Sequence, residues 1–172
     1  MDKWFRDNIP FSLENYGIGA YDNPIAGIGF HAVWDEQYER ILLTKRDLIP
    51  TNTFIELYDA GTIAFDSVAG EYVSKLGPGG LTTFSIDWDD TTYFTKSGWT
   101  ISYHAESNIW VSFHDYIPYL YTYDKQFMLS LQDDGNSAAR RTIWEHSDLT
   151  DPGYFYRVQY PFEFEFIFNQ GK

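Results

Sequence analysis

The stretch from Trp99 to Pro118 constrains the fold most strongly, because it has the pattern of two short strands joined by a tight turn. Residues 99–104 alternate large apolar with small polar side chains, and residues 109–114 are rich in β-branched and aromatic ones. A short polar segment, 105–108, separates them, and Pro118 ends the pairing because proline has no N–H to donate to a ladder. Alternating runs on either side of turn residues predict a β-hairpin.

The same pattern recurs along the chain. Residues 28–50 show a strand, a polar turn, an apolar strand, a charged dipeptide and a proline, a layout that echoes the hairpin above. Further strands are predicted for residues 53–58, 62–65, 71–75, 119–123, 127–131, 141–146 and 161–168. No long stretch has the period of a helix. We therefore predict an all-β fold, an antiparallel hairpin meander that is either β-propeller-like or sandwich-like, with an irregular N-terminal arm.

The arm is expected to cover residues 1–24, in which asparagine and isoleucine precede prolines and are pushed out of the helical region. Its apolar side chains need a surface, either on their own domain or on a neighbouring molecule; they are Trp4, Phe5, Ile9 and Phe11. Residues 25–172 are expected to form a single β-rich domain, since the chain length suits one core. Two loose repeats, 25–80 and 81–169, are a further option within that domain.

The charge of the chain limits its partners. The net charge is −13 and the 12 basic residues form no cluster larger than two neighbours, so we expect no sequence-specific nucleic-acid binding and no binding to anionic membranes. An acidic surface either keeps the protein in solution or forms a wall past which DNA slides. There is no cysteine, no signal-peptide pattern and no apolar run long enough for a membrane span, so a soluble protein is expected.

No catalytic constellation is visible. None of the four histidines has a metal-ligand spacing; they are His31, His104, His114 and His146. The pair His114–Asp115 lacks a nucleophile elbow, and neighbouring strand residues point to opposite faces. The acidic run 87–90 lacks the glycine and closing glutamate of a calcium loop. We predict no catalytic, cofactor-binding or metal residue and no enzyme, while a carboxylate pair for glycoside hydrolysis stays open, because its separation is a three-dimensional property.

The aromatic content favours binding over catalysis. The chain has 14 Tyr, 14 Phe and 6 Trp, more than a core of this size commonly needs. Exposed Trp and Tyr on a β scaffold stack on sugar rings or anchor protein interfaces. We infer that some of these side chains lie at contacts with other subunits.

One pattern resembles a known family. It is carried by Trp99, Ser102, Tyr103, Trp110, Ser112, Phe113, His114, Tyr116 and Pro118, and further pieces lie between residues 22 and 169. It is similar to the virion structural proteins of crAss-like tailed bacteriophages, closest to their tail "muzzle" or tail-tip proteins. The resemblance implies a mechanical role in rings or tubes around the DNA exit path, with a passing contact to DNA and no catalytic residue.

The same resemblance implies the partners and the location. The partners would be other copies of the chain and other virion tail proteins, and the protein would be part of the virion tail after assembly in the host cytoplasm. Two alternatives remain from the residues themselves: a carbohydrate- or receptor-binding β module, and, more weakly, a glycan-active enzyme with two carboxylates.

Overall fold

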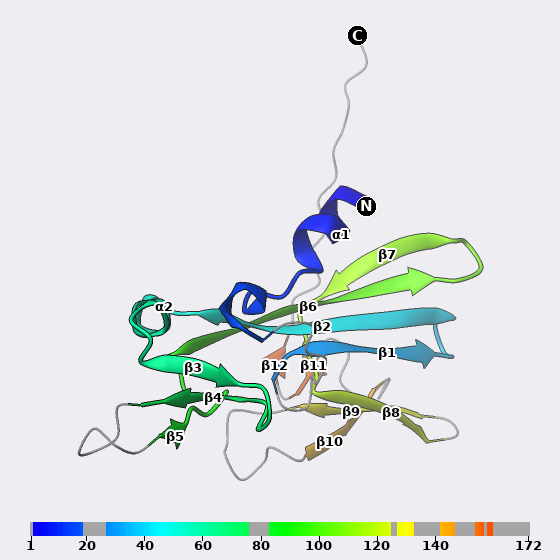
Figure 1. Ribbon diagram of the computed structural model, residues 1–172. Helices are drawn as coiled ribbons and strands as arrows, with labels where there is room; N and C mark the ends of the chain where they lie inside the picture. Colours follow the sequence, from blue (N-terminus) through cyan, green and yellow to red (C-terminus); the bar gives the residue numbers. More distant parts are fainter. Residues whose placement is uncertain are drawn as a thin grey trace.

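Antiparallel strands dominate the computed structural model, which describes residues 2–18, 27–75, 83–124, 127–132, 142–146, 154–156 and 158–159 (Figure 1). The strands are β1 (Gly29–Asp35), β2 (Arg40–Pro50), β3 (Ile63–Asp66), β4 (Glu71–Ser74), β5 (Phe84–Ser85), β6 (Phe94–His104), β7 (Ile109–His114), β8 (Leu120–Asp124), β9 (Phe127–Gln132), β10 (Thr142–Glu145), β11 (Tyr154–Phe155) and β12 (Val158–Gln159). The helices are α1 (Asp2–Asn8), the short 3-10 helix Glu14–Tyr16 and α2 (Asn52–Asp59). The predicted all-β, antiparallel class is confirmed, whereas the predicted final strand, 161–168, lies outside the described residues.

The largest sheet has the order β1-β2-β6-β7, and we call it the central sheet. It contains both of the clearest predicted hairpins, β1–β2 and β6–β7, side by side (Figure 1). Arg40, which begins β2, lies opposite His104, which ends β6. The turns 36–39 and 105–108 therefore lie next to each other at one end of the sheet, which we call the turn end.

One face of the central sheet packs against a second sheet of order β10-β9-β8. Thr44 on β2 joins this interface through a hydroxyl–hydroxyl hydrogen bond of 2.9 Å to Tyr121 on β8, and a second of 2.8 Å to Thr100 on β6. The apolar side chains around it are Leu42, Tyr116, Tyr121, Met128 and Tyr156, with Val33 and Trp144 at the margin. The buried hydroxyls of Thr44, Thr100 and Tyr121 are tolerated here because each has a hydrogen-bond partner.

A second core lies beyond the other end of the central sheet, under α2 and the small sheet β3-β4-β5. Its buried members are Leu13, Ile18, Ile28, Leu48, Phe54, Ile63, Tyr72, Ile86 and Phe94. The Tyr72 hydroxyl donates to the carbonyl of Tyr16 at 2.8 Å, so the segment after α1 is tied into this core. None of the helices in the described part of the chain is long and apolar enough to cross a bilayer.

The described part of the N-terminal arm, residues 2–18, folds onto its own domain, and its first part is helical rather than irregular as predicted. In α1, Trp4 contacts Trp99 and Phe113 edge-on, with ring centroids 5.0 and 4.9 Å apart, and Phe5 contacts Trp110 at 4.8 Å. The helix α1 lies on the side of the central sheet opposite to β8 (Figure 1). A helix of this length is stabilised by packing rather than by its intrinsic helix propensity. The helix α1 could therefore not be predicted from the sequence of the arm alone.

The predicted strand over residues 53–58 is wrong, because α2 occupies this segment. Thr51 caps the helix, its hydroxyl accepting from the backbone N–H of Phe54 at 3.3 Å. Phe54 and Tyr58, one helical turn apart, both join the second core, and their rings lie 5.9 Å apart. The apolar residues that suggested a strand are therefore spaced as on one face of a helix, four residues apart. Because residues 53–58 form no strand, β3 pairs with β4.

We expect Phe54→Ala to lower the free energy of unfolding by about 3–5 kcal/mol, because the ring is fully buried and its removal leaves a cavity. Urea denaturation measures the change. Phe84→Ala is the matched control, since that ring is 42% exposed and should cost far less. Equal losses in the two variants would contradict the position of Phe54 at the centre of the second core.

Candidate functional site

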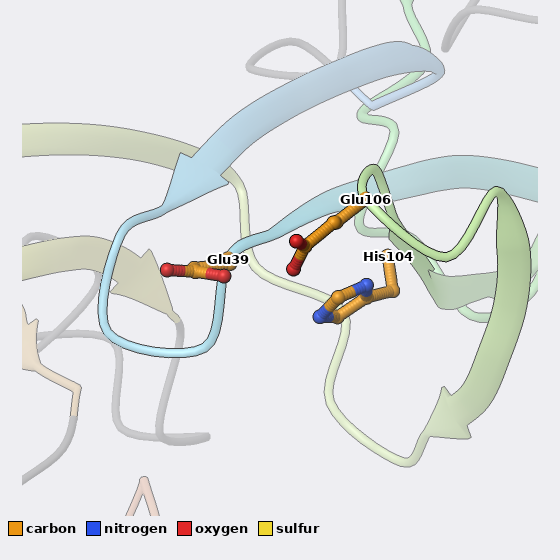
Figure 2. Close-up of side chains that lie close together, drawn as sticks. All are labelled: Glu39, His104 and Glu106. Atoms are coloured by element: carbon orange, nitrogen blue, oxygen red, sulfur yellow. The ribbon is translucent and has the colours of Figure 1, made fainter.

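Three side chains with metal-binding or acid–base chemistry meet at the turn end of the central sheet. They are Glu39 in the β1–β2 turn, His104 at the last position of β6, and Glu106 in the β6–β7 turn (Figure 2). Each offers one ligand atom, and these atoms all lie within 4.8 Å of one another. Both glutamates are exposed and His104 is half-buried. We call these three residues the turn-end cluster.

The pairing of β2 with β6 creates the turn-end cluster. Arg40 lies opposite His104, so Glu39, the residue before Arg40, is carried next to the end of β6. Both turns close with a residue in the left-handed region, Glu39 at φ 49° and Asn108 at φ 56°, a conformation that non-glycine residues seldom adopt. The strand register, not the sequence spacing, brings the glutamate of one hairpin to the histidine of the other.

The turn-end cluster concentrates negative charge. Among the described residues, neither Glu39 nor Glu106 forms an ion pair. The adjacent cation, Arg40, donates from Nε to Asp35 at 2.9 Å and lies over the ring of Tyr38, 4.6 Å from its centroid. Two carboxylates thus lie near each other, and no cationic side chain among the described residues is bound to them, so a cation from solution would neutralise their charge.

The ring of His104 has a defined environment. Its Nδ1 accepts the backbone N–H of Ser107 at 3.2 Å, so the neutral ring carries its proton on Nε2. An imidazole nitrogen with two carboxylate oxygens is a mixed donor set of the kind that binds Zn²⁺ and related ions. This donor set could not be predicted from the sequence, because the three residues have no motif spacing, and only the register of β2 and β6 brings them together.

The carboxylates of the turn-end cluster are poorly placed for glycoside hydrolysis. Glycosidases hold their two carboxyl groups on either side of a bound sugar, about 5–9.5 Å apart. Here both carboxylates lie on exposed turns. A pocket of about 260 Å³ lies elsewhere, and it is lined by Arg46, Asp47, Lys96, Ser97, Ile117, Tyr119 and Gln132. The weaker enzymatic alternative therefore gains no support from this site.

A serine–histidine pair occurs in the core rather than at a surface. Ser130 Oγ lies 2.6 Å from Nε2 of His146 and 2.6 Å from the hydroxyl of Tyr156, and all three residues are buried. Burial lowers the pKa of His146 to about 4. A nucleophile needs access to its substrate, and Ser130 is only 2% exposed. The three buried side chains therefore provide one another with hydrogen-bond partners, and Ser130 is not placed to attack a substrate.

The remaining predicted residues are held by local contacts. His114 Nε2 lies 3.4 Å from the hydroxyl of Ser112, whereas its neighbour Asp115 is exposed. In the acidic run, Asp87 accepts from the backbone N–H of Asp89 at 2.9 Å, and Asp89 pairs with Lys96 at 2.9 Å. The structure therefore brings together neither a triad nor a calcium loop from these residues in the part of the chain that it describes.

No protein-family model matches the chain, and neither the curated proteins nor the solved structures yielded a match. The family resemblance of the Trp99–Pro118 pattern is thus an expectation that these comparisons leave untested.

We expect the stability of the protein to fall as the pH drops from 6.5 towards 4. The pKa values of His114 and His146 lie near 4 in the folded state, mainly because burial disfavours the charged ring, against an ordinary value of 6.5. Between pH 6.5 and pH 4 the unfolded chain binds more protons than the folded chain, so the free energy of unfolding falls as the pH is lowered. The full contribution of the two neutral histidines to stability is present above pH 6.5. From pH 7 to pH 5 each histidine should remove about 2 kcal/mol from the free energy of unfolding.

Urea denaturation at pH 7, 6 and 5 measures this dependence. Carboxylates also begin to titrate near pH 5, so the informative quantity is the difference between the wild type and His146→Gln. The variant should be less stable at pH 7 and should lose about 2 kcal/mol less between pH 7 and pH 5. An unchanged pH dependence in the variant would show that His146 does not have a lowered pKa.

Proposed function

We propose that this chain is a structural component of a bacteriophage virion, part of the tail, and that it works through contacts between subunits rather than by catalysis. The resemblance of the Trp99–Pro118 pattern supports this proposal, and the pattern covers the end of β6, all of β7 and the segment that leads to β8. Its partners would be other copies of the chain and other tail proteins, and its assembly would take place in the host cytoplasm.

The observation that carries the proposal is the apolar edge strand β7. It is the last strand in the order of the central sheet, and no described strand other than β6 pairs with it. Ile109, Val111 and Phe113 are 55%, 52% and 54% exposed, an unusual apolar load for an edge in water. Exposed apolar side chains that lie close together are typical of contact surfaces for another chain.

A bulge shapes the contact that this edge can make. The register between β6 and β7 shifts between Ser102 and Tyr103, so Val111 has no residue opposite it. Bulges interrupt continuous strand pairing and thereby limit uncontrolled aggregation. We infer that a neighbouring subunit packs against the side chains of β7 rather than extending the sheet.

The proposal also covers architecture and charge. Of the two predicted architectures, the sandwich-like one is favoured, because the central sheet and the sheet β10-β9-β8 face each other across Leu42, Tyr121 and Met128. The net charge of −13 suits a channel wall that DNA passes without binding, since like charges repel.

A second candidate function is a carbohydrate- or receptor-binding module. It is favoured by the aromatic side chains exposed around the β1–β2 hairpin, Trp34 at 45% and Tyr38 at 49%. The hydroxyl of Tyr123 reaches this turn by donating to Glu36 at 2.7 Å, so a third ring lies nearby. Flat, exposed rings of this kind stack on sugars. A glycan array with wild type and Trp34→Ala tests it, because sugar binding should depend on Trp34.

The structural function predicts self-association through β7. At high protein concentration the wild type should form oligomers by light scattering, and rings or tubes by electron microscopy. Val111→Lys should weaken association at least tenfold, because it places a charge in an apolar contact. Val68→Lys is the matched control, since Val68 is 96% exposed in the turn after β3 and should leave association unchanged.

A wild type that stays monomeric at high concentration would overturn the proposed contact. Equal effects of the two valine variants would overturn the assignment to β7. Both substitutions replace exposed side chains, so the variants are expected to fold, and circular dichroism checks this.

A further inference from the structure

We propose that Glu39, His104 and Glu106 bind one divalent transition-metal ion, with Zn²⁺ as the probe. The two glutamates supply carboxylate oxygens and His104 supplies a ring nitrogen (Figure 2). Three protein ligands leave room for water in the remaining coordination positions, as is usual for a zinc ion held by three side chains. His104 lies opposite Ile109, the first residue of β7, but the metal proposal does not depend on the virion role.

The distances within the turn-end cluster suit a site that tightens around an ion. Zinc bonds of about 2.0–2.2 Å in a tetrahedron place neighbouring ligand atoms about 3.4 Å apart. The ligand atoms of the three residues lie within 4.8 Å, so the required movement is about 1 Å or a little more. Glu39 and Glu106 are exposed and can make this adjustment by rotating side-chain torsions, without moving the strands.

The charge of the surroundings favours a cation. Neither Glu39 nor Glu106 forms an ion pair among the described residues, and the guanidinium of Arg40 is bound to the buried carboxylate of Asp35. A divalent ion would neutralise both carboxylates in a chain whose net charge is −13. Without an ion, no cationic side chain among the described residues balances these two carboxylates. The ring nitrogen of His104 adds a third ligand to the two carboxylates.

The donor set also selects among cations. Ca²⁺ prefers six to eight oxygen ligands and Mg²⁺ prefers an octahedron of oxygens, whereas two carboxylates and one imidazole offer neither. Imidazole nitrogen suits Zn²⁺, Ni²⁺ and Cu²⁺. The site should therefore distinguish Zn²⁺ from Ca²⁺ and Mg²⁺, which gives the experiment an internal control.

Metal binding must break one hydrogen bond. Nδ1 of His104 accepts the N–H of Ser107, so an ion at Nδ1 displaces that donor. An ion at Nε2 instead moves the ring proton to Nδ1, which can then no longer accept. In both cases the N–H of Ser107 is released, and the amide of Ser107 reports the event.

Isothermal titration of the untagged full chain with ZnCl₂, after removal of metals by a chelator, tests the proposal. We expect one Zn²⁺ per chain, and no heat from CaCl₂ or MgCl₂. Glu39→Gln, Glu106→Gln and His104→Gln should each weaken binding at least tenfold, because each removes a ligand. Glu14→Gln is the matched control, since Glu14 is an exposed carboxylate outside the turn-end cluster, and it should bind as the wild type does.

A nitrogen–proton correlation spectrum gives an independent measurement. Zn²⁺ should shift the amide signal of Ser107 in the wild type and leave it in place in Glu106→Gln. The proposal is overturned if Zn²⁺ produces no heat, if binding survives both glutamate substitutions, or if one ion binds per two chains. The glutamate variants keep the test decisive if His104→Gln fails to fold, because both glutamates are exposed.

Discussion

The pairing of β2 with β6 is the interaction on which the rest of the structure depends. All eleven residues of β2 are in register with β6, from Arg40 opposite His104 to Pro50 opposite Phe94. Each outer strand, β1 or β7, needs only a local turn to join its partner. The pairing of β2 with β6 is the step that joins segments far apart in the sequence, so it carries the cost in chain entropy. Gly98 permits the close approach, because a Cβ there would meet the carbonyl oxygen of Lys45 at 2.3 Å.

Three consecutive charged side chains of β2 are buried, which is unusual for a central strand. Lys45, Arg46 and Asp47 are all at least nine-tenths buried. Lys45 binds Asp47 at 2.9 Å and the carbonyl of Pro10 at 2.7 Å, and Asp47 accepts from both the N–H and the hydroxyl of Ser12. The buried ion pair thereby tethers the N-terminal segment to the sheet. Such a network contributes more to a single, defined arrangement than to net stability, since desolvation offsets much of the attraction.

The parts of the fold that are formed by residues close together in the sequence can be predicted from the sequence. The hairpins 28–50 and 99–118 were predicted from alternation and turn residues, and both are confirmed, because their pairing is local. The helix α2 was missed, because its apolar residues suit a strand until the second core fixes the side that Phe54 and Tyr58 must face. The turn-end cluster was missed for a related reason: nothing in the spacing of Glu39 and His104 foretells that Arg40 and His104 lie opposite each other.

The metal proposal and the proposed contact through β7 meet at one residue pair. His104 lies opposite Ile109, the first residue of β7, and the turn that joins them contains Glu106. Without an ion, this turn carries one of the two carboxylates that form no ion pair among the described residues. An ion held by Glu39, His104 and Glu106 would link the β1–β2 turn to the β6–β7 turn and reduce the freedom of the strand that begins at Ile109. The apolar edge would then be presented in a more defined position, so the ion would lower the entropy that a subunit contact has to overcome.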